Sequence, residues 1–246
     1  MPFRPLRLGI LVPSSNTALE PLTIEIVRNL APNVSVHFSR FRVTSISLDP
    51  SALSQFDTYG PIMSAARLLA DAHVDVIGWS GTSAGWLGFE SDVKLCQAIT
   101  AEFGMPATTS TLALNRALDM LGAKKFALVT PYLDDVQARI LKVYASSGYT
   151  IVAESHLGIS ENVKIAEIDE ATLDRQIISV LKKGEGEVQA ISTFCTNLVA
   201  AQRVAVWERE HGIPVLDTVS TVVWDMLRLK GWQKGAIEGW GQLFEL

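Results

Sequence analysis

The sequence predicts an α/β protein made of two similar lobes, each with a parallel sheet covered by helices. Short apolar runs rich in Val, Ile and Leu alternate with segments of helical periodicity along the whole chain. Strands of this composition are typical of parallel sheets, which are buried on both faces. The same order of motifs also occurs twice, which indicates one architecture for both lobes.

Three pairs of segments carry this internal repeat. "RLGILVPSSNTALEP" corresponds to "KFALVTPYLDDVQARI", "VDVIGWSGTSAGW" to "VQAISTFCTNLVA", and "FGMPATTSTLALNRALDMLG" to "HGIPVLDTVSTVVWDMLRLKG". The matched residues include Pro13 with Pro131, Gly81 with Cys195, and Pro106 with Pro214. We therefore expect two Rossmann-like or flavodoxin-like lobes related by a pseudo-twofold axis, with an active site between them.

The apolar runs predict strands near 7–12, 34–40, 74–79, 107–109, 125–130, 150–154, 189–194 and 215–217. Helical periodicity predicts helices at 18–30, 61–72, 86–103, 112–121, 134–147, 170–183, 197–210 and 219–229. Thr17 and Glu20 have the spacing of a capping box, which favours a helix directly after the first strand.

This order of elements predicts a first lobe at 1–112 and a second lobe at 113–217. The C-terminal segment 218–246 is expected to return to the first lobe. The segment 45–60, rich in Pro, Ser and Gly, predicts a mobile loop beside the site.

Bulk composition favours small-molecule chemistry. The chain has 246 residues, of which 48% are hydrophobic and 19% charged, and these values are typical of a folded globular protein. Its net charge of −5 and its scattered basic residues argue against binding to nucleic acid or to an anionic membrane. No apolar run is long enough to span a bilayer and no secretory leader is evident, so a cytoplasmic location is expected.

Nothing in the sequence indicates a cofactor or a metal. No G-x-G-x-x-G or P-loop motif is present, and the four histidines do not cluster with carboxylates. The two cysteines, Cys96 and Cys195, lie too far apart in the sequence to suggest a disulfide framework or a zinc site.

Small polar residues follow the predicted strands, at the edge where α/β lobes collect their ligands. The candidate site residues are Pro13, Ser14, Asn16, Gly81, Thr82, Ser83, Tyr132, Asn162, Cys195 and Thr196. Cys96 has the helical context of an ordinary packing residue, whereas Cys195 ends a strand and precedes a predicted helix. A helix N-terminus there favours a thiolate and a lowered pKa, although a small buried hydrophobe is the alternative for this cysteine.

Hydroxyl groups and backbone amides near Cys195 predict a site for an anion. Thr82, Ser83, Tyr132 and the N–H groups at the junction after Cys195 are suited to holding a carboxylate or an enediolate. The alternative for Thr82, Ser83 and Thr196 is helix capping, which the same residue types perform. Asn16 and Asn162 are further candidates for a hydrogen bond to a second carboxylate, with turn or cap duty as the alternative for Asn16.

Taken together, these motifs resemble the aspartate/glutamate racemase superfamily, and within it the branch of arylmalonate decarboxylase and maleate cis-trans isomerase. "VPSSNT", "CTNL" and "LGISENVKIAEID" are similar to the isomerase, whereas "GTS", "YLDDVQARI" and "GWGQLFEL" look like the decarboxylase. The resemblance implies two α/β lobes with a cofactor-independent site at their interface. It also implies one cysteine from each lobe in racemases and isomerases, but glycine in the first lobe of the decarboxylase, as Gly81 has here.

The resemblance therefore favours a cofactor-independent decarboxylase of a malonate-type diacid, with aryl or alkyl substituents, in which Cys195 protonates the enediolate. Asn16 and Asn162 match isomerase positions that hold the substrate carboxylate, which favours a smaller or more polar diacid. Two alternatives stay open: a maleate isomerase-like enzyme in which Ser83 or water replaces the absent thiol, and a diacid-binding protein without turnover. A small dicarboxylate is the expected partner, and a homo-oligomer is compatible with the sequence.

Overall fold

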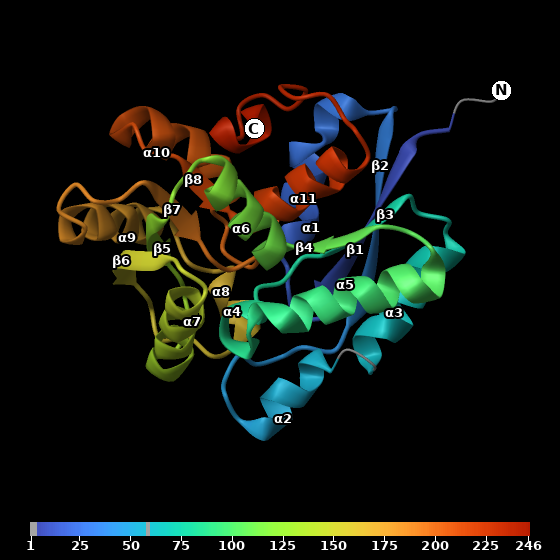
Figure 1. Cartoon of the computed structure of the whole chain (residues 1–246), viewed down its shortest axis with the longest axis horizontal. Helices are drawn as coiled ribbons and strands as arrows, with labels where there is room; N and C mark the ends of the chain where they lie inside the picture. Colours follow the sequence, from blue (N-terminus) through green and yellow to red (C-terminus); the bar gives the residue numbers. More distant parts are fainter. Residues whose placement is uncertain (1–3, 58–59) are drawn as a thin grey trace.

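The computed structural model describes residues 4–57 and 60–246. Two parallel sheets of four strands lie side by side in the two halves of the molecule (Figure 1). The first sheet has the order β2-β1-β3-β4 and the second has the equivalent order β6-β5-β7-β8. The strands are β1 Leu6–Pro13, β2 Val34–Phe41, β3 Val76–Trp79, β4 Ala107–Thr109, β5 Lys125–Val129, β6 Thr150–Ser155, β7 Ala190–Thr193 and β8 Val215–Asp217. The predicted two-lobed α/β fold with parallel sheets is thus confirmed.

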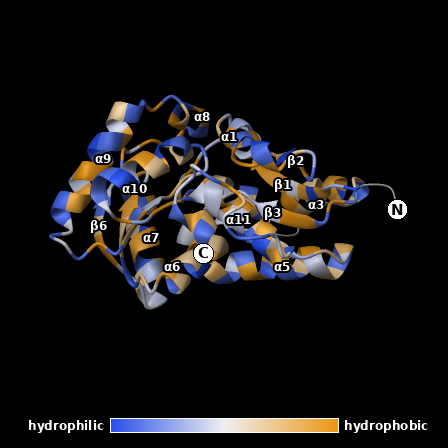
Figure 2. Ribbon diagram, turned by 90° about the horizontal axis from the view of Figure 1, so that it is seen from above, coloured by the Kyte–Doolittle hydropathy of each residue, from blue (hydrophilic) through white to orange (hydrophobic). Residues whose placement is uncertain are grey.

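Helices cover both sheets. Those that precede the second sheet are α1 Leu19–Ile26, η1 Arg28–Leu30, α2 Pro50–Leu53, η2 Ser54–Phe56, α3 Pro61–Asp71, α4 Ala84–Leu87, α5 Phe89–Phe103 and α6 Ser110–Met120. The remainder are α7 Asp134–Ser146, α8 Asn162–Ile165, α9 Glu170–Lys183, η3 Ala201–Arg203, α10 Val204–His211, α11 Thr218–Leu229 and η4 Gln242–Glu245. Outer helices such as α5 and α9 mix hydrophilic and hydrophobic residues, because each buries one face against a sheet (Figure 2).

The internal repeat is visible in the hydrogen bonds. The carbonyl of Pro106 accepts from Ile77 N at 3.0 Å, and the carbonyl of its counterpart Pro214 accepts from Ile191 N at 2.9 Å. Each bond ties the start of a fourth strand to the third strand of its sheet. The carbonyl groups of the two aligned prolines therefore make equivalent hydrogen bonds in both lobes.

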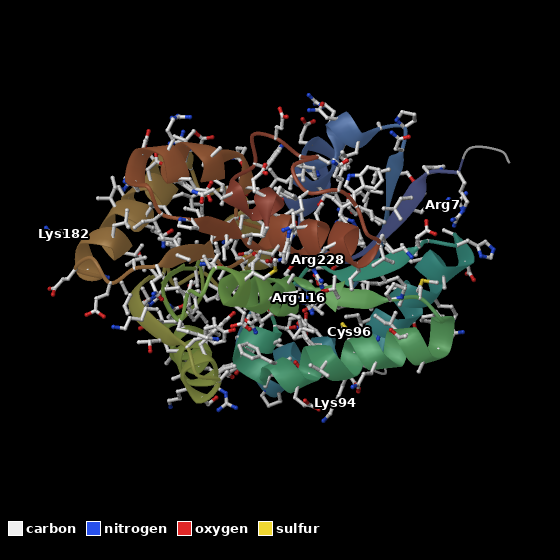
Figure 3. The ribbon with its side chains drawn as sticks, turned by 45° about the horizontal axis from the view of Figure 1, so that its top comes forward. Arg7, Lys94, Cys96, Arg116, Lys182 and Arg228 are labelled. Carbon is white, nitrogen blue, oxygen red and sulfur yellow. The ribbon has the colours of Figure 1, made fainter. Side chains whose placement is uncertain are left out.

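Helix α11 crosses from the second sheet to the first. It packs against α6, α1, β3 and β4. At its N-terminus Ser110 Oγ donates to Thr218 O at 2.7 Å, and Thr221 Oγ1 donates to Ser110 O at 3.1 Å. Further along, the buried carboxylate of Asp225 accepts hydrogen bonds from Arg116 and Arg228, whose labelled side chains lie near each other in Figure 3. These contacts connect the chain that follows the second sheet to the first lobe. The domain boundaries at 112 and 217 stay a prediction.

The predicted capping box is wrong. Helix α1 begins after Ala18 without a side-chain cap, and Glu20 pairs with Arg40 instead. The N–H groups of Ala18 and Leu19 donate to Asn16 Oδ1 at 3.0 and 2.9 Å. The side-chain oxygen of Asn16 therefore takes the place of the predicted Thr17 cap. The capping side chain lies one residue earlier than the Thr17–Glu20 spacing suggests.

The predicted helix at 197–210 is also wrong in its first part. Residues 197–200 form turns, η3 begins at Ala201, and α10 begins at Val204. The predicted loop 45–60 contains α2 and η2 up to residue 56, and residues 58–59 lie outside the described part. Within residues 4–57 and 60–246, no helix is long and apolar enough to cross a membrane.

Candidate active site

A cavity of about 300 Å³ lies where the carboxyl ends of strands from both sheets meet. Eight of the ten predicted site residues line it: Pro13, Gly81, Thr82, Ser83, Tyr132, Asn162, Cys195 and Thr196. Pro13 ends β1, Gly81 to Ser83 follow β3, Tyr132 follows β5, and Cys195 follows β7. Residues more than a hundred positions apart are brought together because parallel strands in each sheet end at the same edge.

Ser14 and Asn16, the other two predicted residues, do not line the cavity. Ser14 Oγ accepts from Val43 N at 3.1 Å and so fixes the segment after β2. Asn16, besides capping α1, donates through Nδ2 to Thr196 Oγ1 at 3.2 Å. Both side chains hold the walls of the cavity in place without facing it.

Asn197 is a residue whose importance the sequence did not reveal. Its Oδ1 accepts from Thr17 N at 3.0 Å and from Ala18 N at 3.1 Å, and its Nδ2 donates to Asn162 O at 2.6 Å. One buried side chain therefore connects the first lobe with two loops of the second. The "CTNL" motif was the only signal for it.

Asn162 lies at the start of α8, where the chain meets the first lobe. Its side chain donates to Ser15 Oγ at 2.9 Å, and its backbone N–H donates to Thr44 O at 3.3 Å. Ser45 and Glu161 form an antiparallel bridge beside it. The segment after β2 and the segment before α8 thus close one side of the cavity together.

Apolar side chains form the rest of the wall. They are Val43, Ile46, Phe56, Trp79 and Trp86. Trp79 and Trp86 flank Gly81 in the sequence, whereas nothing in the sequence indicates that Val43, Ile46 and Phe56 reach the same cavity. Trp86 packs edge-on against the ring of Tyr132, with centroids 5.3 Å apart, and this contact orients the tyrosine ring in the wall.

The thiol of Cys195 is buried, and its surroundings favour the neutral thiol that proton transfer needs over the thiolate that a helix N-terminus would favour. Burial raises its pKa from an ordinary 9.0 to about 11, although hydrogen bonds from Tyr132 and from the N–H groups of Asn197 and Leu198 act in the opposite direction. No regular helix begins directly after it, so the predicted helix N-terminus that would stabilise a thiolate is absent from this described segment. At neutral pH the group is a thiol.

Tyr132 connects the thiol with the first lobe. Its hydroxyl lies 2.6 Å from Thr82 Oγ1 and also contacts the thiol of Cys195. Burial holds the pKa of Tyr132 well above 10, so its hydroxyl keeps its proton and remains a hydrogen-bond donor.

Backbone amides supply the remaining donors. Among the described residues, the N–H groups of Thr82, Ser83, Cys195 and Thr196 have no hydrogen-bond acceptor, although all four residues are buried. Buried N–H groups are almost always paired. Four unpaired ones around a small cavity are suited to an anionic ligand such as a carboxylate.

A larger cavity of about 590 Å³ lies near the C-terminus. Its walls include Trp224, Trp232 and Phe244, together with the charged side chains of Arg228 and Lys234. Among the described residues that line it, there is no cysteine, serine, threonine, tyrosine or histidine. We therefore place the candidate active site at the smaller cavity.

The sequence profile of a family described as arylmalonate decarboxylase matches residues 8–244. The chain belongs to the arylmalonate decarboxylase family. It is similar to arylmalonate decarboxylase of Bordetella bronchiseptica, with 29% identity over 75% of this chain and 77% of that protein. It is also similar to maleate isomerase of Pseudomonas putida, with 27% identity over 90% of each chain.

Solved structures of both kinds of relative share this fold. The chain matches a variant of the maleate isomerase Iso from Pseudomonas putida S16 with maleate, with a TM-score of 0.87, 25% identity and 98% coverage of both chains. A double mutant of arylmalonate decarboxylase in its liganded form matches with a TM-score of 0.84 at 24% identity, over 98% of this chain and 99% of that one. The predicted branch of the superfamily is therefore confirmed, and its members include both decarboxylases and isomerases.

Proposed function

We propose that the protein is a cofactor-independent decarboxylase of a malonate-type diacid, with Cys195 as the proton donor. The observation that carries this proposal is the asymmetry of the cavity. Its wall has one thiol, buried and protonated, on the side of the second lobe, and Gly81, without a side chain, at the matching position of the first. An acid on one face is sufficient to protonate an enediolate.

The site has the parts that this reaction needs. One carboxylate of the diacid would accept hydrogen bonds from the free N–H groups of Thr82, Ser83, Cys195 and Thr196 and from the Tyr132 hydroxyl. The other would lie against the apolar wall, where Val43, Ile46 and Phe56 offer it no hydrogen bond. Poor solvation of this second carboxylate favours its loss as neutral CO₂.

The steps balance with the residues present. The bond between the α-carbon and the second carboxylate breaks, CO₂ leaves, and the electron pair remains on the substrate as an enediolate. The Cys195 thiol then gives its proton to the α-carbon, and the resulting thiolate takes a proton from solvent. A raised thiol pKa suits this role, because the acid must be protonated when the enediolate forms.

The size and polarity of the cavity support a small substrate. It is the smaller of the two cavities described above, and side chains from both lobes close it in. Asn162 brings a polar group to the wall, beside the segment that holds Val43 and Ile46. Methyl- or phenyl-substituted malonates are therefore the first substrates to test.

A maleate isomerase-like activity is the second candidate. It is favoured by the presence of Asn162 in the wall and by the 90% coverage of the maleate isomerase relative. Such a reaction needs a nucleophile to add to the double bond. With Gly81 in the first lobe and a protonated Cys195 in the second, Ser83 or water would have to supply it.

Proton NMR in D₂O distinguishes these reactions. The enzyme is incubated separately with phenylmalonate, methylmalonate and maleate. A monoacid with one deuterium at its α-carbon is the expected product, and Cys195→Ala should abolish its formation while Cys96→Ala, at a site outside the cavity, should not. Fumarate from maleate with no reaction of the malonates would establish the isomerase. Saturable binding of the diacids without any turnover would identify a binding protein.

A further inference from the structure

Space, and not backbone conformation, requires glycine at position 81. The backbone of Gly81 is not in the left-handed region. A Cβ atom built there would lie 2.1, 2.3 and 2.6 Å from three atoms of the Trp79 indole. Separations this short do not occur between non-bonded carbon atoms, so any side chain at position 81 would require the indole to move.

Trp79 cannot move freely. It is the last residue of β3, in register with Leu11 of β1 and Thr109 of β4, so its backbone is held from both sides. Its side chain is 2% exposed, and its ring packs against Phe41 with centroids 5.0 Å apart. A buried aromatic ring in such contact is displaced only by repacking its neighbours.

The indole also separates two cavities. Trp79 lines the candidate active site, and it lines a second cavity of about 250 Å³ bounded by residues such as Ile62, Leu95 and Asp92. Phe56 and Ser83 are common to both walls. Trp79 therefore fills the first-lobe side of the site with an indole, which can neither donate a proton to the α-carbon of a substrate nor remove one from it.

We propose that Trp79 is a specificity-determining residue that restricts the site to one proton donor. Its indole occupies the volume in which a side chain at position 81 would stand opposite Cys195. The chemical part of this proposal rests on the proposed function. If the protein is a decarboxylase, the position of Trp79 explains why the proton reaches only one face of the enediolate. Inversion of the product needs a second acid or base on the other face.

A thermal unfolding cycle tests the steric part without reference to any reaction. Gly81→Ala in the wild-type background should lower Tm by roughly 3–10 °C, because the new methyl group overpacks the indole. In a Trp79→Leu background the same substitution should change Tm much less. Gly85→Ala is the matched control: its Cβ would lie 2.6 Å from the Phe194 ring, so it should be equally destabilising in both backgrounds.

A deuterium-exchange assay tests the chemical part. In D₂O at a pH near 10, where part of Cys195 is ionised, its thiolate removes the α-proton of the enantiopure monoacid, and a thiol introduced by Gly81→Cys returns a deuteron to the opposite face of the enediolate. The combined variant Trp79→Leu with Gly81→Cys should racemise the monoacid about 10²-fold faster than Gly81→Cys alone. Adding Cys195→Ala should abolish the gain.

The two readouts separate the possible failures. Equal Tm losses for Gly81→Ala in both backgrounds would overturn the proposal, as would equal racemisation by the single and combined cysteine variants when the wild type decarboxylates malonates. A wild-type enzyme that does not decarboxylate any malonate, while the Tm cycle shows the expected coupling, would refute the proposed function and leave Trp79 as the group that excludes a side chain at position 81.

Discussion

The raised pKa of Cys195 leads to a quantitative prediction for the pH dependence of decarboxylation. Burial moves this pKa from 9.0 to about 11, and the proposed proton donor must be a thiol. At pH 9.5 a group with a pKa of 11 is about 97% protonated, whereas an ordinary thiol with a pKa of 9.0 would be about 24% protonated. We therefore expect kcat/KM at pH 9.5 to be nearly equal to its value at pH 7.5.

Initial rates of CO₂ release from the best malonate substrate, measured between pH 7 and 10.5, provide the test. Circular dichroism at each pH controls for unfolding, and thiolate absorbance in a Cys96→Ser variant reports the titration of Cys195 itself. A fall of kcat/KM to about one quarter by pH 9.5 would mean that the thiol has an ordinary pKa. A kcat/KM that rises with pH would refute the role of Cys195 as proton donor, because it would identify the thiolate as the active form.

Three other predictions concern the donors, the buried charge and the loop connections. Tyr132→Phe removes the hydroxyl that lies 2.6 Å from Thr82 Oγ1. We expect kcat to fall by roughly 10²-fold with little change in Tm. An unchanged kcat would exclude this hydroxyl from the anion site. Asp92 has its pKa raised by burial from 3.8 to about 7, so its contribution to stability is present below pH 4 and is lost as pH rises through 7. Chemical denaturation at pH 4.5 and 7.5 should therefore show a smaller loss of stability in Asp92→Asn than in the wild type, and equal losses would contradict this. Asn197→Ala removes three hydrogen bonds to backbone groups, which should lower the free energy of unfolding by about 3 kcal/mol. A calorimetric scan should then show a Tm lower by roughly 6–12 °C. A loss below 1 °C would show that the loops do not depend on Asn197.

The sequence predicted the sheets well because their signal is local. A strand buried on both faces must consist of apolar residues, so runs such as "LGILV" and "FALV" mark β1 and β5 directly. The repeat then predicted that the lobes share one strand order. It also brought Gly81 and Cys195 to equivalent positions, because each follows the third strand of its sheet.

Helix starts and loops were predicted less well. The spacing of Thr17 and Glu20 satisfied a local rule, but Asn16 and the distant Asn197 accept the hydrogen bonds of the first turn. Likewise, Val43 and Ile46 have no local feature that distinguishes wall residues from other apolar positions. Their place in the cavity depends on the contact between the segment after β2 and the segment before α8.

By itself, the sequence determined the two-lobed α/β architecture, the superfamily branch and eight residues of the cavity wall, since strand order and motif spacing are written along the chain. The protonation state of Cys195 was decided only by the tertiary structure, because desolvation depends on every group packed around the thiol. The exclusion of a side chain at position 81 has the same origin. Trp79 is only two residues away in sequence, yet the turn after β3 and the packing on Phe41 decide that its indole occupies that space.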